Sequence, residues 1–190
     1  DAQGGSGASY SFDGTDDYVE VAHDASLEPG DGDFSASVWF KYDGSSTETI
    51  FLLNKRTTVY GDGWLILLVE TSPGSGIYSV RFNLDDDAGN NNASAPYRVE
   101  TPASGIADGE WHNITCVFDK DVGLTFYKDG VSLGSKAATQ ITGTVTAPTV
   151  NLRIGYYNEA GTPGYFDGQI SQVRLHNRAL SAAEVRAAYN

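Results

Sequence analysis

The dipeptide Asp129-Gly130 constrains the fold more than any other part of this chain, because it separates two segments of alternating strand-type residues. An Asp-Gly pair suits a two-residue type I′ turn, since both central residues of that turn need a positive φ and glycine adopts one without a Cβ clash. The preceding segment, residues 111–119, has the same alternating character. We therefore predict antiparallel strands joined by tight hairpins, and hence a protein built from β-sheets.

Alternating patterns recur along the whole chain and are separated by turn-forming residues. They cover residues 18–21, 34–42, 49–54, 64–70, 78–83, 111–119, 124–128, 152–156 and 168–176. In the second segment, one strand face carries Phe34, Ala36, Val38, Phe40 and Tyr42, and the other carries Ser35, Ser37, Trp39 and Lys41. We predict that the apolar face lines a core between two sheets about 10 Å apart.

A short helix is predicted at the carboxyl end. Ser181 and Glu184 have the spacing of a capping box, and Leu180 and Val185 are placed as its hydrophobic staple. About two helical turns are expected, with Val185 and Tyr189 on the inward face at i and i+4. This helix is expected to fasten the end of the chain onto the sandwich.

The 190-residue length suits one sandwich domain, which we place at residues 9–190. Residues 1–8 have the Gly- and Ser-rich composition of a linker, so we expect a tether to another module of a longer protein. The longest apolar run, residues 64–69, falls far short of the roughly 18 residues that a membrane-spanning helix needs. Membrane insertion is therefore not expected.

Acidic residues outnumber basic ones by 25 to 12, which gives a net charge of −13. This charge opposes unspecific binding to nucleic acid and to anionic membranes. The carboxylates offer oxygen ligands to hard cations such as Ca²⁺, although an acidic surface also serves solubility alone. Nucleic acid is thus excluded as an expected partner, and the charge alone identifies no metal site.

The reactive side chains do not form a catalytic group in the sequence. The single cysteine, Cys116, lies in the apolar alternation of residues 114–118 and is predicted to be a small buried hydrophobe. His23, His112 and His176 lie in three separate segments without a Ser or Cys motif beside them. Structural or surface roles are favoured for all three histidines.

Six blocks of sequence, within residues 9–189, carry a family resemblance. They are Ser11–Val21, Gly32–Lys41, Asp108–Val131, Leu152–Gly155, Tyr165–Arg174 and Arg178–Val185. In this order they resemble the LamG-like (laminin G-like) jelly-roll domains of the concanavalin A-like lectin/glucanase superfamily. The resemblance implies an all-β fold, a two-sheet antiparallel jelly-roll sandwich, in an extracellular protein.

Catalytic activity is disfavoured by the same resemblance. Glucanases of the superfamily resemble one another in a Glu-x-Asp-x-x-Glu run, which supplies paired carboxylates and is absent here. The nearest pair, Asp85 and Asp87, is expected in a loop too flexible to hold either group in place. Polysaccharide lyases of the same superfamily are marked by a Gln-Ile-His sequence, whereas this chain has Gln169-Ile-Ser171. A non-catalytic domain is expected, and a degenerate hydrolase or lyase is the weaker alternative.

The resemblance also implies a calcium ion at the rim where the first and last strands meet. Asp13, Asp31, Asp33 and Asp167, each beside a glycine, are the candidate ligands. Ca²⁺ takes 6 to 8 oxygen ligands, which suits a mixture of carboxylates and backbone carbonyls. The alternative is that these Asp-Gly pairs only form turns.

Three loops combine aromatic, amide and acidic side chains in the way that sugar sites do. The candidate ligand-binding residues are Tyr60, Asp62, Trp64, Asp86, Asn91, Tyr97, Tyr157 and Tyr165. Packing at the sheet edges is an equal alternative for the aromatic ones. We predict a lectin-like, calcium-containing module that directs an attached enzyme or adhesin to glycans, with a structural spacer or protein-interaction module as the alternative.

Overall fold

The structure is a computed structural model that describes residues 8–45, 49–56, 61–86, 98–103, 105–137, 141, 143–147, 149–159 and 162–190. At residues 98–103, 159 and 162 it describes the backbone alone. The expected linker lies almost wholly outside these ranges and stays a prediction.

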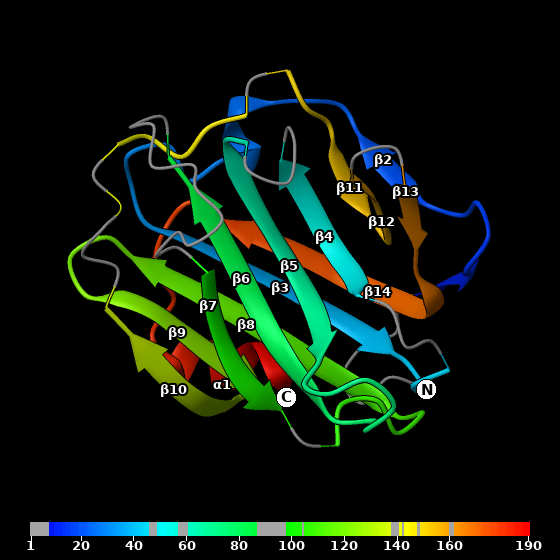
Figure 1. The fold of residues 1–190 in the computed structure, drawn as a ribbon. Helices are drawn as coiled ribbons and strands as arrows, with labels where there is room; N and C mark the ends of the chain where they lie inside the picture. Colours follow the sequence, from blue (N-terminus) through cyan, green and yellow to red (C-terminus); the bar gives the residue numbers. More distant parts are fainter. Residues whose placement is uncertain are drawn as a thin grey trace.

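Two six-stranded antiparallel sheets stack face to face (Figure 1). The first sheet contains, in spatial order, β1 (Tyr10–Asp13), β14 (Asp167–His176), β3 (Phe34–Lys41), β8 (Trp111–Asp119), β9 (Gly123–Lys128) and β10 (Val131–Lys136). The second sheet contains β2 (Val19–Val21), β11 (Leu152–Ile154), β4 (Ile50–Arg56), β5 (Gly63–Glu70), β6 (Tyr78–Asp85) and β7 (Arg98–Ala103). A separate hairpin joins β12 (Tyr156–Glu159) to β13 (Thr162–Tyr165). The predicted all-β jelly-roll sandwich is confirmed.

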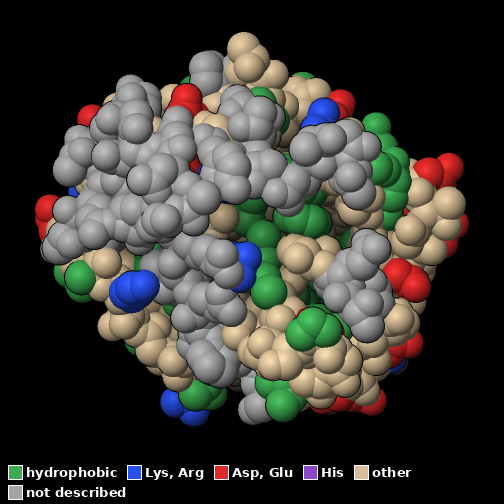
Figure 2. Space-filling view, in the orientation of Figure 1, with side chains coloured by type: hydrophobic (Ala, Val, Ile, Leu, Met, Phe, Trp, Pro, Cys, Tyr) green, Lys and Arg blue, Asp and Glu red, His purple; other side chains and the backbone are tan. Residues whose placement is uncertain are grey.

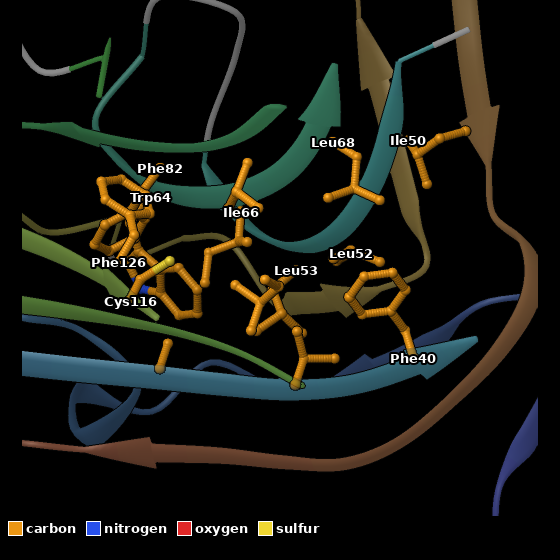
Figure 3. Close-up of a cluster of buried hydrophobic side chains, with 14 of the residues drawn as sticks. Phe40, Ile50, Leu52, Leu53, Trp64, Ile66, Leu68, Phe82, Cys116 and Phe126 are labelled. Atoms are coloured by element: carbon orange, nitrogen blue, oxygen red, sulfur yellow. The ribbon is translucent and has the colours of Figure 1, made fainter. Parts of the chain in front are cut away.

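The core lies between the two sheets and follows the predicted alternation. The apolar face of β3 is fully buried in it, and so is Cys116, whose thiol pKa is raised by burial. Figure 3 shows the two sheets meeting through their inward side chains, with Trp64, Phe82 and Phe126 gathered near Cys116. These large side chains exclude water between the sheets, and they leave only the outer faces and the rims for contact with a ligand.

The predicted hairpin turn is confirmed in its backbone geometry. Lys128 pairs with Val131, and the two residues between them have positive φ values, 51° at Asp129 and 73° at Gly130. The Asp129 carboxylate accepts a hydrogen bond from the backbone N–H of Asn113 at 2.8 Å. The turn is thereby attached to strand β8.

The predicted carboxyl-terminal helix is α1 (Ala182–Tyr189), and its capping box of Ser181 and Glu184 is present. Val185 is buried against the outer face of the first sheet, and the ring of Tyr189 stacks on Trp39 with centroids 5.3 Å apart. The short 3-10 helix η1 (Ala25–Leu27) is the other helical element described. Among the described residues, none of the helices is long and apolar enough to cross a membrane.

The alternating segments do not cover β1, β7, β10, β13 or most of β12, although the family resemblance includes β1 and the Asp129-Gly130 turn implies β10. Strands β7 and β13 contain Pro102 and Pro163, and proline inside a strand pattern argues against a paired strand. Both strands lie at sheet edges, where a missing N–H donor is tolerated. Residues 156–165, expected as a ligand-binding loop, are therefore largely a hairpin.

Candidate functional site

A bulge in β4 decides which of its side chains point away from the core. The pairing with β5 shifts between Phe51 and Leu53, so that Leu52 and Leu53 both enter the core. Strict alternation would have turned Asn54 inward, whereas the extra residue turns it outward, opposite Leu65. We call the face on which Asn54 lies the outer face of the second sheet, and Figure 2 looks onto it.

Asn54, Leu65 and Asn83 form one row across β4, β5 and β6. The side chain of Asn54 is almost completely buried, with 1% of the residue exposed. Within the described part of the chain, neither its Nδ2 nor its Oδ1 atom has a hydrogen-bond partner, and the buried Oδ1 of Asn83 has none either. An unsatisfied buried polar group costs about 1–3 kcal/mol, so this row needs an explanation beyond stability.

The next row consists of Arg56, Gly63 and Asp85. Arg56 reaches across Gly63 to form an ion pair of 2.5 Å between its Nη2 and the Asp85 Oδ2. A Cβ atom at Gly63 would lie 2.1 Å from the Lys55 carbonyl oxygen, so glycine is required there. Burial raises the pKa of Asp85 to about 6, although the Arg56 charge opposes this shift.

The position of Asp85 corrects the sequence interpretation. The carboxylate was expected in a flexible loop, but Asp85 is the last residue of β6 and is buried. Asp87, its expected neighbour in that loop, lies outside the described residues.

An apolar cluster lies beside the two polar rows. It contains Phe51, Leu65, Leu67 and Tyr157, with Val69 packed against it. The ring centroids of Phe51 and Tyr157 are 4.5 Å apart, which holds the β12–β13 hairpin against β4. Tyr157 is only 3% exposed and packs against Phe51, so its ring lies inside this cluster, and its stacking on a ligand stays a prediction. Figure 2 shows hydrophobic side chains at the centre of this face.

The polar row continues toward β11 and β2. Arg153 pairs with Asn54 across the strands, and its Nε lies 3.0 Å from the Glu20 Oε2. The Arg153 guanidinium also lies over the Tyr156 ring, 5.4 Å from its centroid. Tyr156 in turn contacts Tyr18 and Tyr165, each with ring centroids 4.9 Å away. Tyr165, a predicted ligand residue, is half-buried in this group of rings, and its role in binding stays a prediction.

The structure separates the four predicted calcium ligands into two groups. Asp13 pairs with Asp167, beyond the end of β3 where Lys41 pairs with Gln169. Asp31 and Asp33 precede the start of β3, where they hold Lys120: the Asp33 carboxylate accepts its N–H at 2.9 Å. The Lys120 Nζ donates to the Asp31 carbonyl at 2.7 Å. Because β3 spans eight residues, about 27 Å at the rise of a strand, the structure does not bring all four residues together in one site.

A different set of carboxylates does converge. Oxygen atoms of Asp13, Asp16 and Asp17 lie within 4.8 Å of one another, on the exposed turn between β1 and β2. Asp167 packs against this turn, since a Cβ atom at Gly14 would lie 3.0 Å from the Asp167 Cβ. Carboxylate oxygens are ligands of the kind that Ca²⁺ prefers, although exposed acidic groups are also common without an ion. Sequence reasoning missed Asp16 and Asp17, although both lie in the Asp-rich segment after Asp13.

The other predicted ligand residues have diverse positions. Trp64 is fully buried in the core and donates its indole N–H to the Leu27 carbonyl at 2.9 Å, so stacking on a ligand is excluded in this structure. Asp86 is buried and accepts the N–H of Gly143 at 2.7 Å. Asp62 is half-buried near Asp85 and stays a candidate. The remaining three, Tyr60, Asn91 and Tyr97, lie outside the described residues.

Comparison with known proteins assigns the family. The profile of the concanavalin A-like lectin/glucanases superfamily matches residues 13–186. The chain belongs to this superfamily. Among curated proteins, no sequence matches it.

Several solved structures have the same fold as this chain but low sequence identity to it. The heptameric SAP-like pentraxin from Limulus polyphemus is 14% identical, with a TM-score of 0.71 over 96% of this chain and 81% of the pentraxin. The CBM40 domain of the Ruminococcus gnavus IT-sialidase is 16% identical, with a TM-score of 0.62 over 96% of this chain and 98% of that domain. The binding domain of Paraclostridial Mosquitocidal Protein 1 is 16% identical, with a TM-score of 0.68 over 94% of this chain but only 42% of that domain.

Proposed function

We propose that this chain is a non-catalytic carbohydrate-binding domain that holds a glycan on the outer face of the second sheet. The observation that carries this proposal is the unpartnered buried amide of Asn54, in one row with the unpartnered Oδ1 of Asn83. Amide groups offer both a donor and an acceptor, which is what the hydroxyl groups of a sugar require. A bound glycan would satisfy the atoms that the described protein leaves unpaired.

The neighbouring apolar cluster supports the same ligand class. A sugar ring has an apolar face as well as polar edges, and Phe51, Leu65 and Leu67 lie beside the two amides. The similar structures include a carbohydrate-binding module of a sialidase and a toxin binding domain. A non-catalytic role fits the carboxylates of this face, because Asp85 is paired with Arg56 and Asp86 accepts from Gly143.

Calcium is part of the proposal, and its site is the turn that contains Asp13, Asp16 and Asp17. Bound there, Ca²⁺ would supply positive charge that offsets the repulsion between the three carboxylates. Asp13 and Asp17 already shape the turn, through the N–H groups of Thr15 and Asp13 that donate to them. Asp16 is therefore the residue most available to the ion. This calcium braces the rim in our proposal and does not touch the glycan.

The proposed context is extracellular, with the domain attached to an enzyme or an adhesin that it directs to glycans. The acidic net charge of −13 supports an exterior setting in which binding to nucleic acid or anionic lipid is suppressed. Secretion and the identity of the attached module belong to the same proposal.

A glycan array probed with the isolated domain, in calcium and in chelator, tests the proposal. We expect hits for the wild type and at least a tenfold loss of binding for Asn54→Ala. Asn177→Ala is the matched control, since Asn177 is an exposed asparagine just beyond β14, in the first sheet. If the folded wild type binds no glycan in either buffer, the function is instead that of a spacer or a protein-interaction module.

A further inference from the structure

We propose that the glycan held by Asn54 and Asn83 is a neutral one, so that uronate, sialate and sulfated sugars are excluded from this face. This inference rests on the proposed function and specifies its ligand class. It is carried by the kind of atoms left unpaired on the outer face and by the pairing of the charges around them.

Two of the unpaired amide atoms require hydrogen-bond donors from the ligand, and the third requires an acceptor. The two acceptors are the Oδ1 atoms of Asn54 and Asn83, and the donor group is the Nδ2 of Asn54. A hydroxyl group both donates and accepts, so it satisfies either kind of atom. A carboxylate or a sulfate group only accepts, and placing one here would leave both acceptors unpaired and add lone-pair repulsion.

The described positive charges near the amides already have partners, and Arg81, two residues before Asn83 on the same face, is not free either. Arg56 is paired with Asp85 at 2.5 Å, and Arg153 with Glu20 at 3.0 Å. Lys55, next to Asn54 in sequence, points into the protein, where its Nζ lies 2.9 Å from the Glu28 Oε1. An anionic sugar would have to displace one of these carboxylates to gain a cation, whereas a neutral sugar leaves the ion pairs intact.

Acidic side chains lie together at the Asp85 end of the two polar rows. Burial is the main cause of the raised pKa of Asp85, and the charges of Asp62 and Asp86 add to it, so an additional negative charge is unfavourable at this place. The whole chain adds to this effect with its net charge of −13. An anionic polysaccharide would therefore be repelled both at long range and at the site.

Paired polysaccharides with the same backbone and different charge provide the test. We would measure the retardation of the domain in native gels that contain one polysaccharide each. The first pair is neutral hydroxyethyl cellulose and acidic carboxymethyl cellulose, and the second is nearly neutral, highly methyl-esterified pectin and acidic polygalacturonate. Isothermal titration calorimetry would give the affinities for the neutral oligosaccharides that bind on the glycan array and for their analogues that carry a carboxyl group. Within each bound pair we expect at least tenfold tighter binding of the neutral member.

Salt dependence separates the two modes of binding. Charged surface interactions are screened over about 10 Å at 0.1 M salt, so binding of an anionic glycan weakens as salt rises, and binding of a neutral one changes by less than about twofold. Asn54→Asp serves as the matched variant, because it keeps the shape and removes the donor. We expect it to lose at least tenfold in affinity for the neutral probe.

The possible outcomes distinguish this inference from the proposed function. Equal or tighter binding of the acidic members, lost on addition of salt, overturns the neutral-glycan inference and leaves glycan binding intact. Failure of the folded domain to bind any array glycan or any member of either class overturns both. A preference for the neutral members in the wild type, with binding of the neutral probe lost in Asn54→Asp and retained in Asn177→Asp, supports both.

Discussion

At the scale of single residues, Asn54 combines a cost in stability with the proposed function. Its buried amide lacks partners among the described residues, and a buried unsatisfied group of this kind destabilises the folded state. A residue that lowers stability where an apolar one would fit is typical of a binding site rather than of a core.

The substitution Asn54→Leu should therefore stabilise the domain and abolish glycan binding. Leucine has the same number of side-chain heavy atoms as asparagine and the same branching at Cγ, and it would extend the apolar cluster at Leu65, so we expect the free energy of unfolding to rise by about 1–3 kcal/mol. Urea unfolding followed by tryptophan fluorescence measures the change, with Asn177→Leu as the control. A loss of stability in Asn54→Leu would mean that the amide is satisfied in the folded protein, and would remove the main support for the site.

At the scale of elements, the sequence predicts where strands lie better than it predicts which of their side chains point away from the core. The Asp129-Gly130 turn and the capping box of α1 are local signals, and both are confirmed. The outward position of Asn54 depends on a bulge, and only the paired Leu52-Leu53, which breaks the period of two, could have indicated it. The second acceptor of the site, Asn83, joins Asn54 through pairing across β5, and no local pattern reports this register.

The β8–β9–β10 meander contains a pH-dependent contact. His112 has its Nδ1 2.8 Å from the Asp129 Oδ2 and its Nε2 3.1 Å from the Asp108 Oδ1. The hydrogen bond to Asp129, more than any other contact, raises the pKa of His112, and burial opposes the shift. Because the folded protein holds this proton more tightly, the contact stabilises fully below the unfolded pKa of about 6.5 and is lost as pH rises through the folded pKa.

We expect His112→Gln to flatten this dependence. Between about pH 6 and pH 9, the free energy of unfolding of the wild type should fall more steeply than that of the variant. Urea titrations at several pH values measure both slopes. Parallel curves for wild type and variant would show that the imidazole gains no proton on folding.

At the scale of the whole molecule, the family could be read from motifs, but the sites could not. Five of the six sequence blocks lie on strands and turns of the sandwich and the sixth lies at the start of α1, and the superfamily profile confirms the family that they indicated. The calcium prediction grouped Asp31 and Asp33 with Asp13 and Asp167 because the family resemblance implies an ion where the first and last strands meet, and residues 30–33 lead into the neighbouring core strand. Strand β3 separates the two pairs, and only the three-dimensional fold reveals that separation.

The turn that contains Asp13, Asp16 and Asp17 connects β1 in the first sheet to β2 in the second, so an ion bound there would link the two layers. A ligand that binds only the folded state stabilises it by about 2.7 kcal/mol at 100 times its Kd. For a domain of this size, this corresponds to a rise in Tm of about 5–10 °C. Chelation should therefore lower Tm by that amount, as differential scanning calorimetry in calcium and in EDTA would measure.

Asp16→Asn should remove most of this calcium-dependent shift while leaving the Tm in EDTA unchanged or slightly higher, because it also relieves repulsion between carboxylates. Asp121→Asn, which changes the same charge on the exposed turn between β8 and β9, should retain the full shift. Calcium titration by calorimetry provides the second measurement. A Tm that is equal in calcium and EDTA, together with an absence of binding heat, would show that the three carboxylates only shape the turn through their hydrogen bonds to the backbone.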